Sequence, residues 1–320
     1  MSSRHLFDCI STNCGPNLTV IRPPTTLDVS RLLLVSALWG TSFLCIAIAL
    51  ADFSPLAIAA WRVILATIAI LGICALRKVK LPRERSVWLL FLAIGMLNSA
   101  VPFTLIGWGQ QSVDSATTAI LIATTPFSTL LMSHWMTGDD KITRFKLLGL
   151  LLGFAGVVVL LGHDAVVNPG SALGMMVILF AASCYSLSSL LIRKLSHLPT
   201  FAIVGGSLIT SCFVLVPALV WLHPPWQQSA SNSAWFAVVF LAAGPTAAAY
   251  LLRAEIVKLN GAVFMSNAGF LIPLFAVLWA WLLLNEWPAP TTWVAMVLIL
   301  AGVGVGRYRA HYLAVKPSGQ

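Results

Sequence analysis

A single charged side chain lies inside the long apolar stretches of this 320-residue chain. It belongs to Arg62, eight residues, or about 12 Å of helix, into an apolar run that begins at Pro55. An arginine at the centre of a bilayer costs about 2.5–3.5 kcal/mol even on the most lenient scale, so other groups must offset that cost. Its guanidinium could hold a carboxylate in a bidentate pair. Alternatively, it could snorkel or bind carbonyl groups freed at a neighbouring helix end.

Several polar and aromatic side chains also lie within the apolar runs, where they could give a small-molecule site a few hydrogen-bonding groups. Asn98 and Asn267 are the sharpest candidates, because an amide in hydrocarbon needs a partner that lipid cannot provide. Bonds between helices are the alternative role for these amides. We predict substrate-binding roles for Trp39, Asn98, Thr124, Thr125, Tyr185, Tyr250 and Asn267.

Four prolines interrupt the apolar runs, and each removes a helical hydrogen bond and exposes a carbonyl group. Broken helices are tolerated in membranes where the freed backbone lines a cavity. A kink that serves only packing is the alternative for any one of them. Because Pro126 pairs with Pro273 along the chain, and Pro102 with Pro245, we predict cavity lining or gating for all four.

The acids and histidines form no visible proton relay. Asp52, Asp114, Asp164 and Glu286 fall at the edges of apolar runs, and His134 is the only histidine within one, near its inner end. We therefore favour facilitated exchange or export down a gradient, with Glu286 and His134 as weaker candidates for proton coupling. The chain lacks a phosphate-binding glycine loop, a metal-binding cysteine pattern and clustered catalytic groups, so we predict no enzyme activity, no cofactor and no metal.

Ten apolar runs must position these side chains. Hydrophobic residues make up 59% of the chain and charged residues 9%, against about a quarter charged in soluble domains. This composition excludes a water-soluble enzyme and a nucleic-acid binder, and helices satisfy the backbone within lipid. The runs are 32–51, 55–76, 87–109, 116–136, 147–162, 172–192, 201–222, 234–252, 262–284 and 290–306.

The basic residues predict the orientation of these spans. If the N-terminus is cytoplasmic, 18 of the 19 lysines and arginines fall in inner tails and loops, and none falls in an outer connection. This is the positive-inside pattern, so we predict a multi-pass protein of the bacterial inner (plasma) membrane with both termini cytoplasmic. The net charge of +9 then reflects topology and contact with anionic lipid.

Three features of the first half recur about 147 residues later. Five spans in each half is an odd number, so the second half must cross the membrane in the opposite direction, as in secondary transporters. We predict an all-α fold of ten transmembrane helices in two inverted five-helix repeats, 31–163 and 171–308, between a disordered tail, 1–30, and a second cytoplasmic tail, 309–320. The recurring features are Pro126 and Pro273, Asp139 and Glu286, and Ala155-Gly156-Val157 and Ala301-Gly302-Val303.

Six motifs occur in a fixed order along the chain: 38–43 (LWGTSF), Trp61-Arg62, 97–106 (LNSAVPFTLI), 123–127 (ATTPF), 270–275 (FLIPLF) and 282–286 (LLLNE). Their order and spacing resemble those of the EamA-type transporters of the drug/metabolite transporter superfamily over residues 32–308. This resemblance implies export of small metabolites, such as amino acids, nucleobase-like compounds or drugs, through a central cavity. It also favours a structural role for Arg62, since the family keeps an arginine there whatever its substrate. Ser183-Cys184 before Tyr185 departs from the family's Trp-Ala pair, so the second wall of the cavity can differ.

We therefore expect an integral membrane transporter that works by alternating access around a midplane cavity. Its expected partners are a small-molecule substrate and the lipid bilayer, without nucleic acid, and its expected state is a monomer or homodimer. A channel-like facilitator is the alternative function. A membrane-embedded receptor or enzyme is less favoured, because the chain shows no soluble signalling domain and no clustered catalytic residues.

Overall fold

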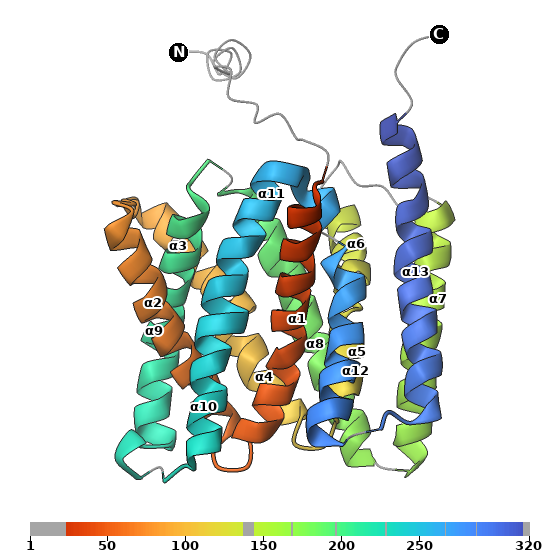
Figure 1. The fold of residues 1–320 in the computed structure, drawn as a ribbon, viewed down its shortest axis with the longest axis horizontal. Coiled ribbons are helices and arrows are strands. Elements are labelled where there is room, and N and C mark those ends of the chain that lie inside the picture. The colour runs from red at the N-terminus through yellow and green to blue at the C-terminus, as the bar shows by residue number, and fades with distance from the viewer. Residues whose placement is uncertain are drawn as a thin grey trace.

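Helices are the regular elements of the computed structural model wherever it describes the chain. Figure 1 shows them side by side in one bundle, with the start of α1 and the end of α13 at the same end, uppermost in the view. Among the described residues, eight helices are long and apolar enough to cross a membrane, and 268–284 and 290–305 are shorter apolar helices. The prediction of an all-helical, multi-span membrane protein is confirmed. The described residues are 24–136, 144–167, 169–195, 197–227, 229–265, 267–285 and 287–315.

The helices of the first half begin at residues that favour helix starts. α1 opens with a capping box, in which Thr25 and Asp28 each bond the other's backbone N–H. α2 follows the N-cap Ser54 and has Pro55 at its first position. The elements are α1 (Thr26–Ala49), α2 (Pro55–Leu76), α3 (Arg85–Gly95), the π-helix η2 (Met96–Ala100), α4 (Val101–Gly109), α5 (Ser115–Ile122), α6 (Thr125–Met136) and α7 (Arg144–Val167).

The second half departs from the predicted spans most clearly between the eighth and ninth spans. α11 continues past the predicted end of the eighth span to Met265, and α12 begins at Ala268, so the predicted start of the ninth span at residue 262 is wrong. Residues 262–265 are apolar but belong to α11, so the apolar run continues across the break between two helices and composition does not mark that break. The elements are α8 (Pro169–Arg193), α9 (Thr200–Leu222), the 3-10 helix η3 (Pro225–Gln227), α10 (Asn232–Leu241), the π-helix η4 (Ala242–Ala248), α11 (Ala249–Met265), α12 (Ala268–Leu284) and α13 (Pro290–Val315).

Two π-helical segments mark the prolines of the third and eighth spans. η2 lies just before Pro102 and η4 contains Pro245, and the two segments begin at residues 96 and 242, 146 residues apart. A proline cannot donate the helical hydrogen bond, and single π turns are frequent at functional sites. The other pair behaves differently, since Pro126 follows a break between α5 and α6 whereas Pro273 lies within an unbroken α12.

Helices of the two halves pack in matching pairs. α2 packs against α9, and α7 packs against α13. α1 packs against α10 and α12, and α8 packs against α4 and α6, which occupy the corresponding places in the first half. The contacts therefore follow the repeat that the sequence indicates.

The close approach of α7 and α13 gives a first testable prediction. A Cβ atom on Gly302 would lie 2.5 Å from the carbonyl oxygen of Gly149 and 2.8 Å from the backbone nitrogen of Gly153. Backbone atoms cannot move aside cheaply, so Gly302→Ala should lower stability by about 1–3 kcal/mol, measured as a lower melting temperature in detergent. Gly72→Ala in α2 is the matched control, because nothing lies within 4 Å of a Cβ there. Equal melting temperatures for the two variants would contradict this tight contact.

Candidate substrate site

A cavity of about 280 Å³ gathers side chains from both halves of the chain. This volume lies near the lower end of the range for small-molecule sites, roughly 300–1,000 Å³. Aromatic and aliphatic side chains form most of its wall, with a few polar groups among them. The predicted site residues on this wall are Trp39 of α1, Arg62 of α2, Asn98 of η2, Thr125 of α6, Tyr185 of α8, Pro245 of η4 and Tyr250 of α11.

Arg62 is buried and is held by groups from two other spans. Its Nε–H donates to the hydroxyl oxygen of Thr246 at 2.8 Å, and its Cζ lies 3.9 Å from the centre of the Phe103 ring. The Thr246 hydroxyl in turn donates to the Leu241 carbonyl at 2.8 Å. Pro245 has no N–H to give that carbonyl, which lies four residues before it. The π turn around Pro245 thus carries the hydroxyl that holds the guanidinium.

Two further hydrogen bonds join the halves across the cavity. The indole Nε1–H of Trp39 donates to the carbonyl oxygen of Pro245 at 3.0 Å. The Asn98 amide donates to the Tyr250 hydroxyl oxygen at 2.8 Å. The Tyr250 proton is then free to point toward a ligand, because this oxygen is the acceptor in its bond with Asn98. Each bond therefore involves a π segment: Asn98 lies in η2 and Pro245 lies in η4.

Two predicted substrate residues do not line the cavity. Thr124 is buried at the break before α6, where its hydroxyl donates to the Leu121 carbonyl at 2.6 Å. Asn267 is exposed and stands at the N-terminal end of α12, because the preceding residues belong to α11. Pro102, Pro126 and Pro273 are also absent from the lining. The side chain of His134 and all of Glu286 lie outside the described residues.

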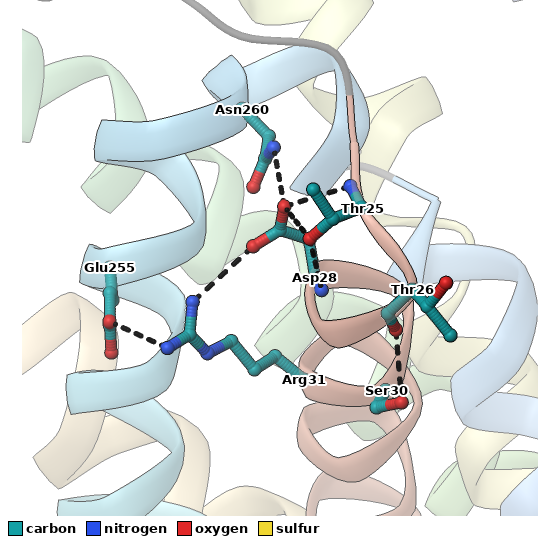
Figure 2. Close-up of polar contacts among 7 residues, drawn as sticks. All are labelled: Thr25, Thr26, Asp28, Ser30, Arg31, Glu255 and Asn260. Atoms are coloured by element: carbon teal, nitrogen blue, oxygen red, sulfur yellow. Dashed lines mark hydrogen bonds and ion pairs between the residues drawn. The ribbon is translucent and has the colours of Figure 1, made fainter.

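A polar cluster at the start of α1 contains residues that the sequence analysis missed (Figure 2). The fully buried Asp28 carboxylate accepts from the Thr25 N–H at 2.9 Å and hydroxyl at 2.8 Å. It also accepts from the Asn260 amide of α11 at 3.2 Å and from Arg31 at 3.3 Å. Arg31 bridges onward to Glu255 of α11 at 3.0 Å. The signal was present in the sequence, since Thr and Asp three residues apart before an apolar run are a capping pattern.

A smaller contact joins α1 and α10 at the opposite end of the bundle. Asp52, in the turn after α1, accepts from the Ser231 N–H at 2.9 Å and from the Ser231 hydroxyl. These two bonds, the hydroxyl bond first, lower the pKa of the Asp52 carboxyl below its ordinary value. Ser231 is the N-cap of α10, so the contact fixes the start of that helix against the first half.

The Asp52 contact predicts a small pH effect with a definite sign. A carboxyl whose pKa is lowered by folding stabilises the fold above its unfolded pKa, about 4, and loses that effect as the pH falls through its folded pKa. Wild type should therefore be slightly more stable than Asp52→Asn between about pH 5 and 8, with the difference shrinking below about pH 4. Melting temperatures of both proteins in detergent across this range test the prediction. A difference that grows on acidification would contradict it.

This architecture defines a class of protein. The chain is a multi-span helical membrane protein, and its two halves enclose a cavity of aromatic and polar side chains. Proteins built in this way are small-molecule carriers. The family follows from the sequence itself. The model of the EamA-like transporter family matches residues 29–162 and again residues 172–305. The chain belongs to this family and carries two copies of its domain.

Named relatives of the chain are bacterial transporters. The chain is 27% identical to the uncharacterized transporter YdfC of Bacillus subtilis, over 84% of this chain and 87% of that protein. It is also 27% identical to an S-adenosylmethionine/S-adenosylhomocysteine transporter of Chlamydia trachomatis, over 88% of each protein. A solved crystal structure with 21% identity has a TM-score of 0.65 over 91% of this chain and 99% of that one, so the two share a fold. The chain is a membrane transporter of the EamA family.

Proposed function

We propose that this transporter exports a small metabolite by alternating access to the cavity described above. The hydrogen bond between Asn98 and Tyr250 carries the proposal, because it joins the two family domains inside that cavity. Two domains of five spans each give ten spans in two inverted repeats, the usual construction of carriers that rock one half against the other. Trp39, Thr125 and Tyr185 would contact the substrate with them.

The contacts at the two ends of α1 suit such a motion. Asp28 and Asn260 join α1 to α11 at one end, and Asp52 and Ser231 join it to α10 at the other. In an alternating cycle, one contact opens while the other stays closed. The distribution of basic residues supports a cytoplasmic position for the Asp28 end and for both termini, in a bacterial inner membrane.

The remaining predicted roles belong to the same proposal. The π segments beside Pro102 and Pro245, and the break beside Pro126, would absorb the bending of the third, fourth and eighth spans. Pro273 would act through packing against α1, since α12 stays helical around it. Glu286 and His134 stay weaker candidates for proton coupling. The working unit would be a monomer or homodimer that binds no nucleic acid.

Counterflow in proteoliposomes tests the proposed function. Purified protein is reconstituted with a bacterial metabolite extract inside, and the lumenal contents are profiled with and without an external trap. A carrier should move a small set of metabolites, saturate, and show accelerated exchange when substrate is present on both sides. Flux that neither saturates nor accelerates would indicate a channel instead, and no flux of any metabolite would contradict transport through this cavity.

A matched pair of amide variants tests the site. Asn98→Ala should raise KM for transport about three- to tenfold, because the Tyr250 hydroxyl loses its donor and its fixed position in the cavity. Asn267→Ala removes the same amide from an exposed position outside the cavity and should leave KM unchanged. Initial rates against substrate concentration measure both values. An equal effect of the two changes would remove Asn98 from the site.

A further inference from the structure

The wall of the cavity carries positive charge without an acidic partner. Arg62 and Arg253 both line it, and its lining, as the structure describes it, contains no aspartate or glutamate. Neither arginine forms an ion pair with a carboxylate in the described part of the chain. A buried cation held by one neutral hydroxyl and one aromatic ring remains poorly compensated for the water it has lost. An anion entering this cavity would supply the missing charge.

The contacts of Arg62 leave its carboxylate-binding edge available. Nε is engaged by Thr246, and the flat face of the guanidinium lies over Phe103. No hydrogen bond of its two terminal nitrogens occurs among the described residues. These nitrogens form the planar fork that matches the two oxygens of a carboxylate. The fixed Nε therefore orients the fork in advance, which lowers the entropy lost when an acid binds.

The rest of the cavity suits an apolar or aromatic body. Trp39, Phe43, Phe103, Tyr185 and Tyr250 all contribute rings to its wall. We infer that the substrate is a small organic anion, with a carboxylate or similar acid bound at Arg62 and an apolar or aromatic body against these rings. This inference rests on the proposed function of the cavity. A cation would meet two arginines there and, among the lining residues that the structure describes, no carboxylate.

Binding of a matched series of head groups tests the inference directly. The probes are 3-phenylpropionate, 3-phenylpropionamide and 3-phenylpropylamine, which share one aromatic body and differ in charge. Calorimetry on purified protein in lipid nanodiscs should give at least about tenfold tighter binding of the carboxylate than of the amide, with the amine weakest. Amide or amine binding as tight as the carboxylate, or binding of none of the three, would overturn the inference.

A charge variant and its control locate the effect. Arg253→Gln should weaken carboxylate binding at least about threefold and leave amide binding unchanged, because only the anion responds to the lost charge. Arg83→Gln removes the same charge from an exposed position outside the cavity and should change neither. An equal response of the two variants would show that general surface charge attracts the anion, which overturns the inference.

The counterflow experiment separates the inference from the function on which it rests. Transport only of metabolites that lack an acidic group, with a KM raised by Asn98→Ala, would overturn the anionic substrate and leave the transporter function intact. Absence of counterflow for every metabolite would reject the proposed function even if the nanodisc protein bound the carboxylate. Saturable counterflow of organic acids would support both.

Discussion

Thr246→Val should destabilise the protein more than Arg62→Met, although the second change removes a formal charge from a membrane span. The Thr246 hydroxyl accepts from Arg62 Nε and donates to the Leu241 carbonyl, both at 2.8 Å. Valine removes both bonds and leaves the buried guanidinium without its hydroxyl acceptor. Hydrogen bonds to charged groups contribute about 1.5–3 kcal/mol and neutral ones about 0.5–1.5, so we expect a loss of about 2–4 kcal/mol.

Arg62→Met should change stability little and transport greatly. Thr246 keeps its bond to Leu241, and removal of a desolvated charge, which costs about 2.5–3.5 kcal/mol to insert, offsets the lost contact with Phe103. Transport of an anionic substrate should fall at least about a hundredfold, because the acid loses its charged partner. Thermal melting in detergent and counterflow in proteoliposomes measure the two effects separately.

The double variant completes this test. Arg62→Met combined with Thr246→Val no longer buries the Arg62 guanidinium without its hydroxyl acceptor, so it should be more stable than Thr246→Val alone. A double variant less stable than both single variants would contradict the described coupling. If Arg62→Met lowers the amount of folded protein and the transport rate by the same factor, Arg62 has the purely structural role that the family resemblance favours.

Pro245 illustrates how far local sequence reasoning reaches in this protein. A proline within an apolar run predicts an interrupted helix, and the interruption is present. The form of the interruption is a π turn in which the Thr246 hydroxyl bonds the Leu241 carbonyl and also accepts from Arg62 of α2. Contacts between residues 184 positions apart arise from packing, and no local pattern contains them.

Thr124, Asn267 and Asp28 show why other parts of the site could not be read from polarity alone. A threonine hydroxyl can bond the carbonyl of its own helical turn, as Thr124 does, so its presence in a span does not indicate a cavity. Apolar residues flank Asn267 and predict a position within a span, but Asn267 is exposed at the break between α11 and α12. Asp28 falls within the predicted tail, 1–30, although its carboxylate is fully buried in the structure.

The buried carboxylate of Asp28 gives the second large expected effect. Asp28→Ala removes the acceptor for Thr25, Asn260 and Arg31 together, so α1 loses its capping box and its main polar tie to α11 (Figure 2). Loss of the cap costs about 1 kcal/mol, and the unpaired partners add about 1–3 kcal/mol. The melting temperature in detergent should fall accordingly. Glu255→Ala removes the other acceptor of Arg31, but that pair is half exposed and contributes about 0–1 kcal/mol, so it is the matched control.

The variant Ser189→Cys, at a position that lines the cavity, distinguishes a gate from a structural tie. In a background without native cysteines, Asp28→Ala should increase the rate at which a membrane-impermeant maleimide labels this residue from the side where α1 begins. The reason is that α1 and α11 separate at that end when their polar contact is lost, whereas the Asp52 contact at the other end is unchanged. Labelling that stays at the control rate while stability falls would mean that Asp28 only anchors the helix. Faster labelling in Glu255→Ala as well would shift the gating role to Arg31, the residue that both acids contact.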